Sequence, residues 1–132
     1  MHRLLAPRAD TLYATMRVVV GLSVAFHGPQ LLLGWWGGVP VVGGPAPLLS
    51  MTGIGGTISL VGGVLIALGL FSSPAAFISS GTLAVGYVLR HAPYGWLPVA
   101  NGGELAMVYE FVLLYIAARG PGVFSVDGMM KK

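Results

Sequence analysis

The sequence predicts an all-α fold, namely a transmembrane antiparallel bundle of four helices that forms one domain over residues 1–132. Only 8% of the residues are charged, whereas a soluble domain carries about 25%. The chain is 55% hydrophobic, its mean hydropathy is +0.83, and its apolar residues form four blocks, at about 12–34, 48–71, 74–91 and 102–118. Because so few charges cannot cover a water-exposed surface, lipid is the expected solvent, and each crossing needs about 20 residues.

The first block, 12–34, is long enough to cross a bilayer but contains polar and helix-breaking residues near its end. His27, Gly28, Pro29 and Gln30 interrupt it, and a tryptophan pair follows. We expect Gly28 and Pro29 to kink the helix where the bundle opens, with neighbouring groups satisfying the freed backbone. The apolar loop that follows should fold over the outer end of the bundle, because irregular backbone is poorly compatible with lipid.

The second block, 48–71, carries a stripe of glycines. Gly55, Gly62 and Gly69 recur every seven residues, which returns to nearly the same face of a helix, and Gly56 and Gly63 lie beside them. A face without side chains lets a neighbouring helix approach closely, as small residues do in membrane bundles. Helix packing is therefore the favoured interpretation, and room for a flat cofactor is the alternative.

The third and fourth blocks carry signals of helix starts. The third begins at Ser73, with Pro74 in the first turn, where the missing N–H of proline costs no hydrogen bond. The fourth, 102–118, is short for a crossing. Asn101 is a suitable cap for it, and Glu104 in the first turn suits the helix dipole.

Basic residues outside the blocks predict the orientation. Arg3 and Arg8 precede the first block, Arg119, Lys131 and Lys132 follow the fourth, and the 35–47 connection has no charge. Because basic residues are retained in the cytoplasm, both termini should be cytoplasmic. The net charge of +3 is small and scattered, which argues against nucleic acid as a partner. The absence of cysteine excludes a disulfide, a thiol redox centre and a Cys-ligated metal.

Two ionisable residues lie within the blocks. Arg17 shares a face of the first helix with Gly21 and Gly28, so this face is expected to pack inward. Glu110 is the acid at a reachable depth in the fourth helix. Charged residues within a membrane usually face the bundle interior, so we predict a buried ion pair between Arg17 and Glu110. The alternatives are a proton path, a headgroup site, or an Arg17 that snorkels to the interface.

A second set of polar residues is expected at the outer end of the bundle. Antiparallel threading brings the outer ends of the first, third and fourth helices to the same height, and an unpaired polar group in hydrocarbon costs several kcal/mol. The residues predicted to converge there, as a candidate site for a quinone or a lipid, are His27, His91, Asn101 and Glu104, with Gln30 and Arg90 at the rim.

The chemistry of this set suits hydrogen bonding or proton transfer better than metal binding. His27, His91 and Glu104 are the right types for a site of two histidines and one carboxylate. However, they come from three segments without local ligand spacing, so no metal is predicted. An imidazole, which titrates near neutral pH, can exchange a proton or bond a quinone carbonyl. No residue is identified as catalytic.

Taken in order, these motifs resemble those of the DoxX family of small bacterial and archaeal membrane proteins. The matching pieces are Arg17 followed by GLSVAFHG, then GWWGG, VGGVLIALGLFSSPAA, RHAPYGWLPVANGGELAMVY and ARGPGVFSVD. The resemblance spans most of the chain, and RGPG followed by FSVD is its most distinctive part. It implies a four-helix subunit of a prokaryotic cytoplasmic (inner) membrane, linked in some family members to quinone reduction during thiosulfate or other sulfur and thiol oxidation.

The chain departs from this family at two positions. Family members often carry HGxxK after the first histidine, where this chain has Leu31. They often carry a glutamate before the double glycine of the second helix, where this chain has residues 59–61, Ser-Leu-Val. The loss of a cation and an anion removes charge from the buried site, which shifts the expectation towards a scaffold or accessory role.

Three classes of function follow from these features. The first is a quinone-interacting subunit of an oxidoreductase, which would need a partner to deliver electrons because the chain has no cysteine and no haem or flavin motif. The second is a non-catalytic structural or accessory subunit of a larger respiratory or photosynthetic membrane complex. A transporter is the least favoured class, since no inverted repeat is evident. The expected partners are the lipid bilayer and other membrane subunits, and no covalently bound cofactor is expected.

Overall fold

The computed structural model describes residues 1–130, and these residues form helices and loops without a strand, which confirms the all-α prediction. Each apolar block corresponds to one long helix: α2 (Ala9–Leu33), α3 (Met51–Leu68), α4 (Ser72–Arg90) and α6 (Glu104–Arg119). The short segments are α1 (His2–Leu5), η1 (Ala6–Arg8), η2 (Trp35–Gly37), η3 (Ala92–Tyr94), α5 (Pro98–Asn101) and α7 (Val126–Met130). Lys131 and Lys132, counted above among the cytoplasmic basic residues, lie outside the described residues.

The sharp turn between α3 and α4 depends on two residues in the left-handed region. Gly69 has φ +72°, and its N–H donates to the carbonyl of Ile66 (3.1 Å), which ends α3. Phe71 follows with φ +47°, so α4 begins at Ser72, one residue before the predicted start. Pro74 lies in the first turn of α4, as predicted.

The end of α2 and the loop after it pack closely on their neighbours. Pro29 lies inside α2, which stays helical to Leu33. A Cβ at Gly28 would lie 2.4 Å from the Cβ of Leu60, so glycine here permits the close approach of α3. The loop returns to the helix at Ala46, which is buried and whose N–H donates to the carbonyl of Leu31 (2.7 Å). The expected folding of the loop over this end is therefore seen at Ala46.

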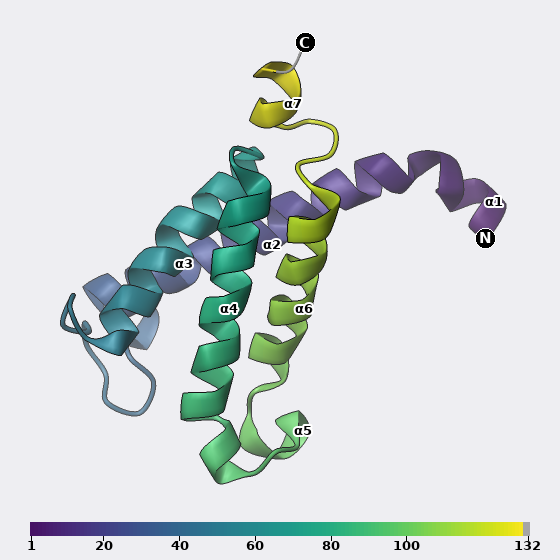
Figure 1. The fold of residues 1–132 in the computed structure, drawn as a ribbon. Helices are drawn as coiled ribbons and strands as arrows, with labels where there is room; N and C mark the ends of the chain where they lie inside the picture. The colour runs from purple at the N-terminus through teal and green to yellow at the C-terminus, as the bar shows by residue number, and fades with distance from the viewer. Residues whose placement is uncertain (131–132) are drawn as a thin grey trace.

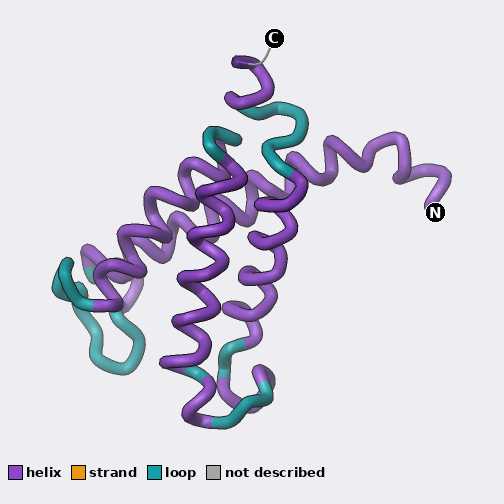
Figure 2. Tube along the Cα trace, in the orientation of Figure 1, coloured by secondary structure: helices purple, strands orange, loops and turns teal. Residues whose placement is uncertain are grey.

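The long helices pack in sequence, α2 on α3, α3 on α4 and α4 on α6. In Figure 1, α4 and α6 run side by side, whereas α2 passes behind them at a wide angle and pairs with α3. The two helix pairs approach each other near the α3–α4 turn and point apart at their other ends. Figure 2 shows that the loops gather at the ends of the long helices.

The hydrophobic core lies where α2 crosses the other helices. The buried apolar residues that contact one another there are Tyr13, Val20, Val24, Ile66, Ala75, Ala76, Leu113 and Ile116. Away from this crossing, many large apolar side chains are exposed, including Val19, Phe26, Val61, Phe77 and Phe111. Two helical runs, His2–Leu33 and Met51–Leu68, are long and apolar enough to cross a membrane. This combination suggests an association with membrane.

The glycines of α3 allow close packing against two different helices, α2 and α4. A Cβ at Gly63 would lie 2.4 Å from the backbone nitrogen of Ala25 and 2.6 Å from the carbonyl oxygen of Gly21, both on α2. A Cβ at Gly62 would lie 2.3 Å from the hydroxyl of Ser79 on α4. Gly55 has ordinary space around it. These contacts support the helix-packing interpretation of the glycines.

We predict that Gly63→Ala destabilises the fold, whereas Gly81→Ala stabilises it. The new methyl group at position 63 would push the backbones of α2 and α3 apart, at a cost of about 1–3 kcal/mol. Position 81 on α4 has open space, so alanine there should add about 0.5–1 kcal/mol through its helix propensity. Denaturant titration of both variants in detergent measures the free energy of unfolding. A Gly63→Ala protein as stable as Gly81→Ala would contradict the backbone contact.

Candidate functional site

Arg17 is the largest fully buried side chain among the described residues, with 0% of it exposed. Its Nη1 donates to the carbonyls of Ile66 (2.6 Å) and Ala67 (2.8 Å), and its Nη2 donates to the carbonyl of Phe124 (2.8 Å). The first two belong to the last turn of α3, where the helix dipole favours a cation. Arg17 therefore joins the middle of α2, the end of α3 and the C-terminal segment.

The C-terminal segment packs into the α3–α4 turn. The Asp127 carboxylate accepts hydrogen bonds from the backbone N–H groups of Phe71 (3.1 Å) and Ser72 (3.3 Å), at the start of α4. The N–H of Asp127 donates to the carbonyl of Gly69 (3.0 Å). Asp127 therefore caps α4, where a carboxylate suits the helix dipole. The FSVD motif thus holds Asp127 on α4 while the carbonyl of Phe124 accepts from Arg17.

A third set of contacts ties the start of α2 to the end of α6. The Tyr13 hydroxyl donates to the carbonyl of Gly120 (2.5 Å), and the Arg119 guanidinium lies 4.2 Å from the centre of the Tyr13 ring. Arg119 also pairs with Asp10 and donates to the Tyr115 hydroxyl (3.0 Å). The hydrogen bond with Tyr115 raises the pKa of Arg119 above its usual value. We call Asp10, Tyr13, Arg17, Arg119 and Asp127 the terminal cluster.

The predicted ion pair between Arg17 and Glu110 does not form. Among residues 1–130, the one side-chain ion pair within 4.0 Å joins Arg119 to Asp10. Backbone carbonyls of α3 and the C-terminal segment accept from Nη1 and Nη2 of Arg17 in place of a carboxylate, while its Nε has no hydrogen-bond partner among the described residues. Glu110 is half-buried, and its backbone carbonyl accepts from the Ser80 hydroxyl of α4 (2.9 Å).

At the other end of α2, His27 bonds to a neighbour on its own helix. Its Nδ1 lies 3.1 Å from the Oε1 of Gln30, and the Nε2 of Gln30 faces the carbonyl of Gly38 at 3.4 Å. Because an amide oxygen can only accept, Nδ1 of His27 carries the proton in this arrangement. In the neutral form of the ring, Nε2 then holds a lone pair.

His91 belongs to a separate group at the end of α4. Its Nδ1 lies 3.1 Å from the carbonyl oxygen of Asn101, and its ring stacks on Tyr87 with centroids 5.9 Å apart. The Asn101 amide donates to the Tyr87 hydroxyl (3.0 Å), which itself donates to the carbonyl of Trp96 (2.8 Å). These bonds hold the connection between α4 and α6 against the end of α4. A carbonyl can only accept, so His91 also carries its proton on Nδ1.

The outer polar residues therefore form two groups, and no hydrogen bond between described residues joins them. Arg90 donates to the Thr52 hydroxyl of α3, and Glu104 is exposed at the start of α6. Since α3 packs between α2 and α4, His27 and His91 bond to different partners, and the convergence of the whole set stays a prediction. Figure 1 shows the ends of the two helix pairs pointing apart.

Asn101 also differs from its predicted role. It ends α5, and its side-chain oxygen accepts from the N–H of Gly103 (2.8 Å), which is itself the cap residue of α6. Tyr87 and Asp127 are the organising residues that sequence reasoning missed. Tyr87 lies four residues before His91, a spacing that places the two side chains on the same face of a helix and could have marked it. Asp127 follows two glycines after the last long helix, a pattern that signals a turn but not its partner.

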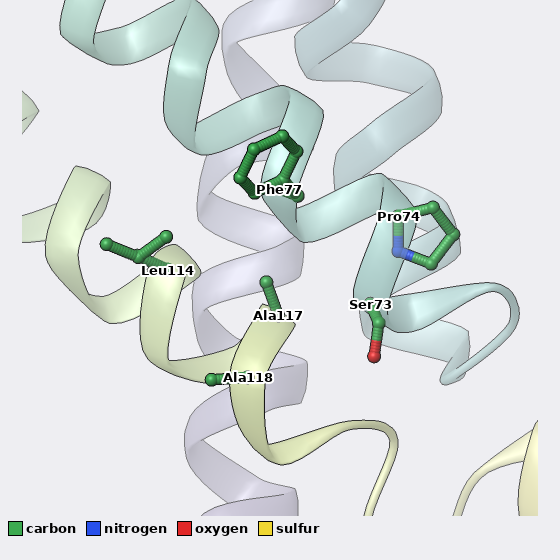
Figure 3. A pocket seen from close by; sticks show the side chains of 6 residues that line it. All are labelled: Ser73, Pro74, Phe77, Leu114, Ala117 and Ala118. Atoms are coloured by element: carbon green, nitrogen blue, oxygen red, sulfur yellow. The ribbon is translucent and has the colours of Figure 1, made fainter.

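Two apolar hollows lie elsewhere on the helices. Figure 3 shows the larger one, of about 440 Å³, between the start of α4 and the end of α6; its lining is Ser73, Pro74, Phe77, Leu114, Ala117 and Ala118. The other, of about 280 Å³, lies between α3 and α4 and is lined by residues such as Val61, Gly62 and Ser79. Neither contains a predicted site residue. Within residues 1–130, no three His, Asp or Glu side chains gather as a metal-binding group.

We predict that Arg17→Met lowers the free energy of unfolding by roughly 3 kcal/mol, because three carbonyls lose a charged donor while the side-chain volume is retained. Arg90→Met is the matched control, since Arg90 is exposed and a surface change costs at most about 0.5 kcal/mol. Denaturant titration in detergent compares the two. An equal loss of unfolding free energy in the two variants would contradict the stabilising role of the Arg17 hydrogen bonds.

No family model and no solved structure match this chain. A protein of Haemophilus influenzae, described as uncharacterized, is 37% identical to it over 126 residues. The aligned region covers 90% of this chain and 90% of that protein, so the similarity extends over nearly the whole of both. The chain therefore belongs to the same protein family as this Haemophilus influenzae protein.

Proposed function

We propose that the protein is a DoxX-like, multi-pass subunit of a prokaryotic cytoplasmic membrane, with a non-catalytic accessory role in a larger membrane complex. The observation that supports the accessory role is that its polar side chains form hydrogen bonds within the protein. Arg17 donates to backbone carbonyls, and the outer histidines form hydrogen bonds in two separate groups. No hollow described above contains them. The large apolar surface is then available for lipid and for other subunits.

The terminal cluster supports the proposed orientation. The Asp10–Arg119 pair and the Tyr13–Gly120 hydrogen bond hold the start of α2 beside the end of α6. Arg3 and Arg8 precede this point in the chain. If the long helices cross a membrane, the basic residues that precede α2 and that end α6 share one side of it, which the positive-inside rule assigns to the cytoplasm.

A quinone-interacting subunit of an oxidoreductase is the second candidate. The observation that favours it is the contact of Nδ1 of both outer histidines with an acceptor oxygen, which in the neutral ring leaves Nε2 with a lone pair. Such a nitrogen could accept a proton or a hydrogen bond from a quinol hydroxyl at the membrane interface. Electrons would have to come from a partner protein.

The accessory role predicts that the protein elutes from mild detergent in a larger assembly. The membrane of the source organism is solubilised, the tagged chain is purified, and the mass of the particle is measured together with its protein composition. Defined companion subunits at constant ratio would support the proposal. A particle that contains only copies of this chain, with a mass of 13.7 kDa each, would overturn it.

The quinone alternative predicts bound quinone in the same preparation. Extraction and chromatography measure its amount per chain in the native protein and in His27→Ala and His91→Ala. His2→Ala is the matched control, because His2 is exposed and precedes the packed part of α2. Loss of quinone in His27→Ala or His91→Ala, but not in His2→Ala, would favour this candidate. If no sample contains quinone although the source membrane does, the quinone-interacting function is excluded.

A further inference from the structure

We propose that residues 2–12 form an interfacial segment that binds the anionic lipid headgroups of the membrane surface. This inference rests on the proposed location of the chain in a membrane. It assigns a lipid class to a part of the molecule that makes little contact with the other helices. Three observations carry it: the path of the segment, the distribution of its apolar side chains and the balance of its charges.

The path of the segment separates it from the rest of the fold. All of residues 1–12 are exposed, and the first buried side chain of the chain is Tyr13. In Figure 1, α1 and the start of α2 extend sideways from the molecule, across the direction of α4 and α6, at the end where α6 meets the C-terminal segment. If α4 and α6 cross a bilayer, this segment runs along its surface.

The segment exposes apolar side chains beside its basic ones. Leu4, Leu5 and Leu12 are 69%, 45% and 50% exposed, so no other part of the described chain covers them. Leu4 and Leu5 lie between Arg3 and Arg8 in the sequence. Exposed apolar side chains next to basic ones suit the boundary between lipid headgroups and acyl chains.

The charges of the segment favour anionic over zwitterionic lipid. Asp10 is its one acidic residue, and it pairs with Arg119. Arg3 and Arg8 have no carboxylate within 4.0 Å among the described residues. Two arginines therefore remain available for phosphate groups. Basic side chains near an anionic surface contribute about 1 kcal/mol each. An anionic phospholipid of the cytoplasmic leaflet fits this combination.

The test uses a spin label, which the absence of cysteine makes specific to one introduced site. The full chain with Leu5→Cys is labelled and reconstituted in phosphatidylcholine vesicles with and without phosphatidylglycerol. Collision with oxygen reports the label in lipid, and collision with a water-soluble nickel chelate reports it in water. We expect the lipid-immersed fraction to rise with phosphatidylglycerol and to fall with salt.

Charge variants identify the groups responsible. Arg3→Gln and Arg8→Gln should each lower the ratio of immersed to aqueous label about fivefold in phosphatidylglycerol vesicles, and the double variant about 25-fold. Arg90→Gln removes the same charge at the far end of α4 and should leave the ratio unchanged. A label at Leu5 that stays in water, or an equal effect of Arg90→Gln, would overturn the inference.

A second labelled position separates this result from a failure of the membrane proposal. Val61 lies in the middle of α3 and is 53% exposed, so a label at Val61→Cys should be in lipid whatever the headgroup. A Val61 label in water would overturn the membrane location itself. A Val61 label in lipid together with a Leu5 label in water would overturn only the surface segment.

Discussion

The arrangement of the helices depends on the guanidinium of Arg17. A buried cation is unfavourable unless it is hydrogen-bonded, and this one bonds to the last turn of α3 and to the C-terminal segment. Three parts of the chain are thereby fixed at one point, while Asp127 fixes the same segment to the start of α4. The crossing of α2 over the core and the position of the α3–α4 turn follow from these bonds. Arg17 acts here as the cap of a helix that belongs to another part of the chain.

The four long helices could be predicted from the sequence because each apolar block has a length close to that of a helix that crosses a membrane. The inward face of Arg17 could also be predicted, from its spacing to Gly21 and Gly28. Its partners could not, because the carbonyls that accept from it belong to Ile66, Ala67 and Phe124, whose side chains carry no polar signal. A search among acidic side chains led to Glu110 instead. Backbone acceptors are present at every residue, so sequence alone cannot select among them.

The outer polar residues illustrate a second limit of sequence reasoning. Their position at one end of the helices follows from the antiparallel order of the bundle. Whether they contact one another depends on which helices are neighbours. Since α3 packs between α2 and α4, His27 and His91 each find local partners, Gln30 and the carbonyl of Asn101. Tyr87, whose four-residue spacing to His91 was not used in the prediction, is the centre of the group at the end of α4. Small residues decide these neighbours, through the approach of Gly63 to α2 and of Gly62 to Ser79.

The contact between Arg17 and Phe124 also has a consequence for the order of events during biosynthesis. Phe124 lies 107 residues after Arg17 and follows α6, so it is synthesised after all four long helices. The three carbonyls that accept from this guanidinium are therefore present together only when the last long helix has been made. Until then Arg17 can bond to the end of α3 but not to the C-terminal segment. The packing of α2 is thus completed late, after the helices that it crosses have been synthesised.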